Sequence, residues 1–125
     1  MIVEKPYTVA IPVPFLDSEG NPLPAEDTEL WVKKTLDELT SCFGGATPVP
    51  AAGTNVLKGQ IVYEKGQVLV LSGCDSQEQY LGYRNRLKSF AEVMRQELRQ
   101  HAVFVLACPS DSFLVVASAR PEGSP

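Results

Sequence analysis

The sequence predicts an α+β domain in which strands and two helices follow the order strand, helix, two strands, helix, two strands. Two observations carry this prediction. Two segments repeat apolar residues at helical spacing, and the stretches around them are short apolar runs rich in β-branched residues. The chain has 125 residues and 44% hydrophobic content, enough for one buried core. We expect one domain over residues 1–119 and a disordered tail over 120–125.

The first strand is predicted over Tyr7–Val13, a short run rich in β-branched residues. Pro12 lacks a backbone donor, so this strand lies at an edge or ends there. Residues 17–24 then combine Gly, Asn and Pro, which are typical of an exposed loop. This loop is either a solvated connection or a flap that contacts a ligand or partner.

The first helix is predicted to begin at Asp27 or Thr28, either of which can cap free amide groups. Gly44 follows where a left-handed residue normally ends a helix, so Gly44 and Gly45 are explained as a helix stop. Trp31 is expected to be buried beside the apolar stripe. The stripe consists of Val32, Leu36, Leu39 and Phe43.

The middle of the chain is predicted to be a loop followed by a hairpin. Residues 48–59 follow neither the helical nor the strand period, so we expect an irregular loop there. Two strands are predicted over 60–63 and 67–71, and Glu64–Gly66 has the length and composition of a turn between them.

The second helix is predicted from the capping box formed by Ser76 and Gln79. It extends to about Gln100, and two further strands are expected over 102–107 and 113–117. Its buried face is the stripe Tyr83, Leu87, Phe90, Met94 and Leu98.

These elements predict a ferredoxin-like βαββαβ antiparallel sheet with two helices on one face and an extra C-terminal strand at an edge. The runs over 68–71 and 103–107 are almost continuously apolar, which indicates that the second face of the sheet is covered as well. We therefore expect a homo-oligomer or a protein partner on that face.

Composition argues against several classes of partner. The net charge is −4 and the cations are scattered, so we expect no nucleic-acid partner. No apolar run approaches the ~20 residues of a membrane helix, and no secretory signal is recognisable, so we expect a soluble, cytoplasmic protein with no membrane partner. The single histidine and the spacing of three cysteines predict no metal site, no disulfide framework and no cofactor.

One pattern resembles a group of small bacterial and phage proteins of unknown function. The pattern joins the turn Phe43–Thr47, a strand ending near Glu64, and the step Gln100–Val103, and it covers roughly residues 28–107. The Gly-x-Trp step of the group is replaced here by Gly53–Asn55. The resemblance implies a ferredoxin-like fold and a site that gathers Gly44, Gly45, Thr47, Glu64 and Gln100.

Three kinds of chemistry remain as hypotheses, each weaker than a structural explanation of the same residues. A Cys/His nucleophile pair would join His101 to Cys42 or Cys108, although a buried apolar cysteine is the usual case. An anion site would use the amides of Gly44–Thr47, but no Gly-Lys-Ser/Thr follows. Paired carboxylates would join Glu64 to Asp17 or Glu19, which are on separate loops.

The sequence thus favours a small non-catalytic interaction or assembly module that self-associates or docks on a partner through its sheet. The alternative is a small enzyme or small-molecule binder. Its pocket would lie near Thr47, Tyr63, Glu64, Gln100 and His101.

Overall fold

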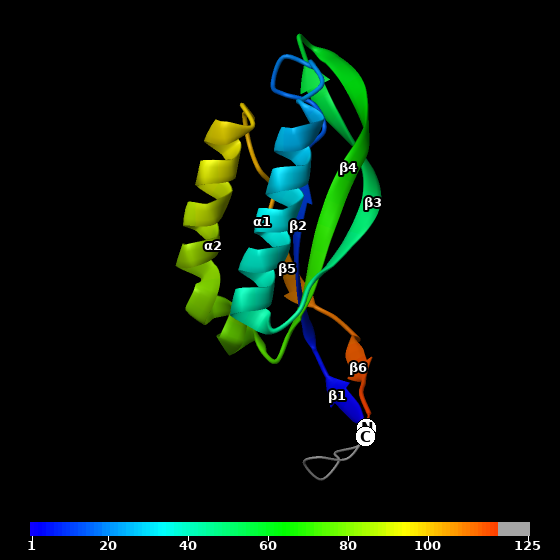
Figure 1. The fold of residues 1–125 in the computed structure, drawn as a ribbon, viewed down its shortest axis with the longest axis vertical. Helices are drawn as coiled ribbons and strands as arrows, with labels where there is room; N and C mark the ends of the chain where they lie inside the picture. The colour runs from blue at the N-terminus through cyan, green and yellow to red at the C-terminus, as the bar shows by residue number, and fades with distance from the viewer. Residues whose placement is uncertain (118–125) are drawn as a thin grey trace.

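The protein folds into a four-stranded antiparallel sheet with two helices on one face, as the computed structural model of residues 1–117 shows (Figure 1). The strands lie in the order β3-β4-β2-β5, which confirms the predicted ferredoxin-like fold. The elements are β2 (Tyr7–Val13), α1 (Ala25–Phe43), β3 (Thr47–Leu57), β4 (Gln60–Cys74), α2 (Gln77–Glu97) and β5 (Leu106–Pro109). The predicted tail over 120–125 lies outside the described residues.

The extra C-terminal strand is present, but it does not extend the edge of the main sheet. β6 (Phe113–Val115) pairs with β1 (Ile2–Glu4) in a separate two-stranded sheet that projects from one end of the molecule (Figure 1). β1 leads directly into β2, and β5 already pairs with β2. The chain therefore stays beside the same N-terminal segment after β5, and the backbone amide of Lys5 donates to the carbonyl of Ser112 at 2.7 Å.

Helix α1 begins at Ala25, two or three residues earlier than predicted, and its N-cap is Pro24 instead of Asp27 or Thr28. Its end is as predicted: Gly44 has a φ of 91° and its amide donates to the carbonyl of Thr40 at 2.8 Å. Trp31 is buried, as expected. The fully buried face is shifted by about one residue from the predicted stripe and consists of Trp31, Thr35, Leu39, Cys42 and Phe43.

Helix α2 confirms the predicted cap, since the Ser76 hydroxyl accepts from the amide of Gln79 at 3.0 Å. The Gln79 side chain turns instead to the amide of Asp75, at 2.7 Å. Within residues 1–117, neither helix has an apolar stretch long enough to cross a membrane.

The β3–β4 hairpin is where the prediction was wrong. Residues 47–57 form a strand despite Pro48 and Pro50, because β3 is an edge strand whose outer side needs no donors. The turn is at Lys58 and Gly59, both with positive φ. The predicted turn at Glu64–Gly66 lies inside the long strand β4, where it forms a bulge. β5 is also shorter than predicted and begins at Leu106, not at 102.

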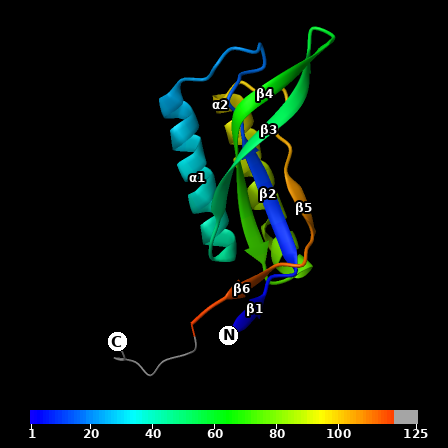
Figure 2. The same ribbon diagram turned by 90° about the vertical axis from the view of Figure 1, so that its right-hand side faces the viewer.

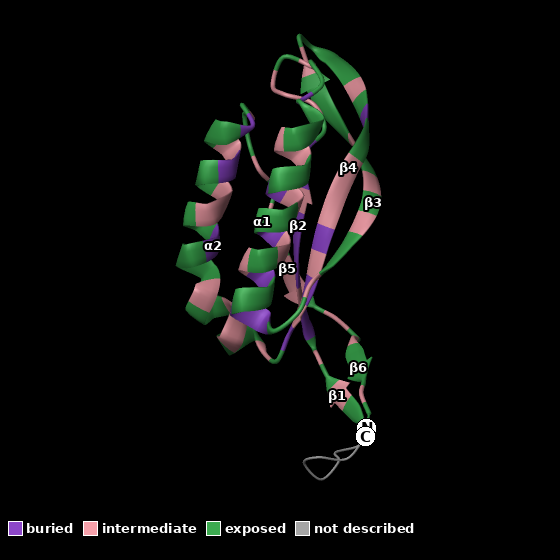
Figure 3. Cartoon of the chain, in the orientation of Figure 1, coloured by how far each residue is buried: buried purple, intermediate pink, exposed green. Residues whose placement is uncertain are grey.

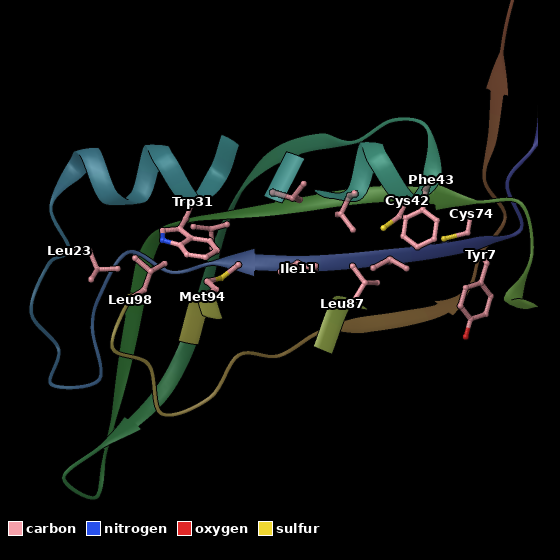
Figure 4. Close-up of a cluster of buried hydrophobic side chains, with 14 residues drawn as sticks. Tyr7, Ile11, Leu23, Trp31, Cys42, Phe43, Cys74, Leu87, Met94 and Leu98 are labelled. Atoms are coloured by element: carbon pink, nitrogen blue, oxygen red, sulfur yellow. The ribbon is translucent and has the colours of Figure 1, made fainter. Parts of the chain in front are cut away.

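The core lies between the helices and the sheet (Figures 3 and 4). Alternate residues of β2 point into it, as the strand period requires. Two aromatic contacts join the helices. The ring centroids of Trp31 and Phe90 lie 5.6 Å apart, and those of Phe43 and Tyr83 lie 5.5 Å apart.

The other side of the sheet carries no helix (Figure 2). Strand alternation and register assign it a largely apolar set of residues, which we call the open face. Glu64 lies on the same side beyond the irregularity in β4, and the Lys5 side chain lies against Gly73 at the other end. It consists of Thr8, Ala10, Pro12, Val49, Ala51, Leu69, Leu71 and Leu106. The apolar character of this face agrees with the expectation drawn from the strand sequences.

Candidate functional site

Glu64 is the one buried acidic side chain among residues 1–117, with 7% of its surface exposed. Its Oε1 accepts hydrogen bonds from the backbone amides of Phe15 at 2.6 Å and Leu16 at 2.7 Å. Its Oε2 accepts one from Nε2 of Gln67 at 2.9 Å. No lysine or arginine of the described chain lies within 4.0 Å of this carboxylate. Neutral amide donors alone therefore stabilise it.

The bulge in β4 is what brings Glu64 and Gln67 together. Residues three apart in a regular strand point to opposite faces. Here Ala51 pairs with Gln67 and Ala52 pairs with Lys65, so Gly66 is an extra residue without a partner. Gly66 takes a φ of 90°, and a Cβ there would lie 3.3 Å from the Phe15 ring. The extra residue puts Glu64 and Gln67 on the same face.

Gln100 fixes the loop that supplies the two amides. Its Nε2 donates to the carbonyl of Leu16 and to that of Leu98, both at 2.8 Å. Gln100 comes just after α2, where Arg99 takes a φ of 51° and turns the chain away from the helix. The end of α2 is thereby tied to the loop that follows β2.

Asp17 shapes the same loop. Its Oδ1 accepts from the amides of Glu19 at 2.9 Å and Asn21 at 3.0 Å. These hydrogen bonds, with the amide of Asn21 foremost, lower the pKa of the Asp17 carboxyl, and Arg99 at 3.6 Å adds to the effect. Asp17 therefore stabilises a turn, which accounts for it without pairing to Glu64.

A cavity of about 230 Å³ opens beside Glu64, and we call it the Glu64 pocket. Its polar wall contains Glu64, Gln67 and Gln100. Its apolar wall contains Phe104, which is 71% exposed, together with Pro12, Pro14, Ala102 and Val103. Pro12 also belongs to the open face, so the pocket and that face adjoin.

The predicted site residues do not all meet in one chain. Glu64 and Gln100 are linked through Leu16, as described. Thr47 pairs with Leu71, whereas Glu64 pairs with Gly53, and six residues of strand correspond to about 20 Å. Gly44, Gly45 and Thr47 line a second cavity of about 350 Å³, at the far end of the open face.

Two other predicted residues lie outside the Glu64 pocket. Tyr63 precedes Glu64 in β4 and so points to the opposite face of the hairpin, where it is 75% exposed. His101 is exposed and does not line the pocket. Gln67 was missed because nothing in the sequence signals that Gly66 is a bulge instead of a turn. Phe104 was missed because residues 102–107 were predicted to be one strand, whereas β5 begins at Leu106.

The geometry does not form the hypothetical pair of Cys42 and His101. Cys42 lies at the end of α1 and His101 follows the end of α2, and the two helices end at opposite ends of the sheet (Figure 1). Burial raises the pKa of the Cys42 thiol and raises that of Cys74 to about 11. Cys108 is half-buried, and none of the three forms a disulfide. Within residues 1–117, no three potential metal ligands gather.

No protein-family model matches this chain, and no curated protein matches it either. Among solved structures, a phage SAM lyase in complex with S-methyl-5′-thioadenosine is 19% identical, with a TM-score of 0.60, over 97% of this chain and 94% of its own. CutA1 from Pyrococcus horikoshii is 14% identical, with a TM-score of 0.50, over 85% of this chain and 84% of its own.

The periplasmic divalent cation tolerance protein CutA from Archaeoglobus fulgidus is 13% identical, with a TM-score of 0.50, over 91% of this chain and 88% of its own. At these identities the similarity is one of fold. It agrees with the ferredoxin-like arrangement described above.

Proposed function

We propose that this chain binds a small molecule in the Glu64 pocket. One observation carries the proposal: a buried carboxylate, with no cation beside it in the described chain, forms part of the wall of a cavity. Burying a charge without a partner costs free energy, and that cost is offset when a ligand supplies the positive charge or further donors. Phe104 and Pro12 provide an apolar surface next to it, suited to a flat ring.

The ligand class to test first is a sulfonium or thioether nucleoside. A sulfonium cation is complementary to the carboxylate of Glu64, and an adenine ring suits the exposed Phe104. The similar phage SAM lyase structure contains S-methyl-5′-thioadenosine, which belongs to this class. Conversion of S-adenosylmethionine to that product would make the chain an enzyme, whereas binding without conversion would make it a binding protein.

Titration calorimetry with S-adenosylmethionine and with S-methyl-5′-thioadenosine tests the proposal. We expect binding by the wild-type chain, and at least a tenfold weaker affinity of Glu64→Gln for the cationic ligand. The glutamine keeps an acceptor for the amides of Phe15 and Leu16 but removes the charge. Glu19→Gln is the matched control, because Glu19 is an acid on the neighbouring loop that does not line the pocket.

Equal binding by wild type and a folded Glu64→Gln variant would reject the Glu64 pocket as the site. Binding of neither ligand to the wild-type chain would reject the ligand class. Liquid chromatography of the incubated samples then separates turnover from binding.

We propose, as a second function, that copies of the chain self-associate through the open face. The observation that favours this is the largely apolar composition of that face, which no helix of the described chain covers. The Glu64 pocket of one chain is also smaller than the roughly 300 Å³ or more of a typical ligand pocket. Because the pocket adjoins the open face, a second copy there would enlarge it.

Light scattering after size exclusion tests self-association at tens of micromolar. We expect a mass above that of the 13.6 kDa chain, and a fall toward that mass for Leu106→Lys. Val93→Lys is the control, because Val93 is an exposed apolar residue that lines the groove between α1 and α2, on the helix side of the sheet. A strictly monomeric wild-type chain would overturn this second proposal and leave the ligand proposal standing.

A further inference from the structure

A second apolar surface lies at the end of the molecule, and we call it the terminal ribbon: β1 (Ile2–Glu4) and β6 (Phe113–Val115). It projects beyond the main sheet (Figures 1 and 2). Ile2, Phe113 and Val115 share one face of the ribbon with Glu4 by register, and these three apolar side chains are exposed, Val115 to 74%. Leu114, on the other face, is exposed as well.

The terminal ribbon has little to stabilise it within one chain. An isolated pair of strands is marginal in water, and three or more strands or a packed face are normally required. Burial of apolar side chains is the main source of such stability, at about 25 cal/mol per Å². Here most large side chains of the ribbon remain in contact with solvent. Within residues 1–117, nothing covers these side chains.

The terminal ribbon is continuous with the open face. Leu114 lines the 350 Å³ cavity together with Leu71 and Gly73, which lie on the outer side of β4. A molecule that covers the end of the open face near Leu71 and Gly73 therefore contacts the terminal ribbon as well.

Charge points to a second copy of this chain as the cover. The chain has a net charge of −4, so two copies repel over most of their surfaces. The residues that define the open face are uncharged, with Lys5 against Gly73 at the ribbon end, and the two strands of the ribbon contain one charged side chain, Glu4, so repulsion between copies is weakest at these surfaces. Each copy carries both surfaces, so a closed symmetric assembly buries both on every copy.

We propose that the terminal ribbon is an arm that packs its Ile2, Phe113 and Val115 face against a neighbouring copy at the open face. This inference rests on the proposed self-association and adds the contact that holds it. It assigns the β1–β6 pairing a role that the ferredoxin-like sheet does not require.

The experiment compares Ile2→Lys/Val115→Lys with Val93→Lys and with Leu106→Lys by light scattering over a concentration series. We expect the ribbon variant to weaken association at least tenfold, as Leu106→Lys does, while Val93→Lys associates like the wild type. Thermal melting followed by circular dichroism checks that each variant keeps the main sheet, which shares no strand with the ribbon.

A photo-crosslinking residue at Val115, in a mixture of ¹⁴N and ¹⁵N copies, gives a readout that does not depend on a destabilised variant. We expect crosslinks between light and heavy copies that map to peptides of the open face around Leu71 or Leu106. An oligomer that keeps its affinity in the ribbon variant, or that gives crosslinks within one copy alone, would overturn the arm and leave self-association intact. A monomeric wild-type chain would overturn both.

Discussion

Gln100 is connected to Glu64 through the backbone of a single residue, Leu16. The Leu16 carbonyl accepts from Gln100 at 2.8 Å, and the Leu16 amide donates to Glu64 at 2.7 Å. Two polar side chains, one from β4 and one from the segment after α2, thus bind the amide and the carbonyl of one loop residue. The connection makes the position of the buried carboxylate dependent on a residue that does not touch it.

Gln100→Ala is expected to loosen this loop. It removes two hydrogen bonds to carbonyls, which corresponds to about 1–2 kcal/mol of unfolding free energy. Hydrogen exchange should accelerate at the amides of Phe15 and Leu16. Gln60→Ala, at an exposed position of the hairpin, is the control and should leave exchange unchanged. Unchanged protection at Phe15 and Leu16 in Gln100→Ala would show that the loop holds Glu64 without Gln100.

Two neighbouring glycines make a matched test of the turn after α1. Gly44 has a φ of 91°, and a Cβ there would meet nothing within 4 Å, so the cost of Gly44→Ala is one of backbone conformation. We expect about 1 kcal/mol of destabilisation in urea unfolding. Gly45 has no positive φ and equally open surroundings, so Gly45→Ala should be close to neutral. Equal effects of the two substitutions would contradict this explanation.

The cysteines should react in an order set by burial. At pH 8 a thiol with a pKa of about 11 is deprotonated in about one molecule in a thousand, so Cys74 is expected to react with iodoacetamide at least a hundredfold more slowly than a free peptide thiol. Cys108, which is half-buried, should react first. Mass spectrometry of digested samples gives the order, and fast labelling of Cys74 in the folded chain would contradict its burial.

The same pKa predicts how stability changes at high pH. Burial disfavours the thiolate, so the pKa of the Cys74 thiol in the folded chain is about 11, above its ordinary pKa of 9.0. The contribution of this raised pKa to the unfolding free energy is fully present below pH 9 and is lost as the pH rises toward 11. Cys74→Ala should therefore show a smaller decrease in unfolding free energy over that range than the wild type. A decrease of the same size would assign the pH dependence to other groups.

Local chemistry made much of the fold predictable. The apolar periods of both helices, the Ser76 cap and the Gly44 stop are decided by residues close in sequence, and all are present in the structure. The strand β3 was not predictable, because Pro48 and Pro50 read as a loop unless the strand is known to lie at an edge. Only the tertiary structure shows that β3 is an edge strand.

The site was predictable in part for a similar reason. Glu64 and Gln100 were singled out, and the structure connects them. The predicted site also included Gly44, Gly45 and Thr47, but within one chain the length of β3 separates these three residues from Glu64 and Gln100. The position of the hairpin turn determines how long β3 and β4 are. The sequence has a glycine suited to a turn at both Gly59 and Gly66, and it does not indicate which of the two closes the hairpin.

Side chains of β4 alternate between the two faces of the sheet, and the extra residue Gly66 makes the alternation on one side of it independent of the alternation on the other. Toward Cys74, the phase is set by the core, which requires Val68 and Val70 to face the helices. Toward the hairpin turn, it is set by Glu64. Removing this one glycine would shift one phase against the other by half a period, and either the carboxylate or the valines would point the wrong way. Adding or removing paired residues at the Lys58–Gly59 turn changes neither phase. The hairpin can therefore vary in length in even steps while the carboxylate stays where it is.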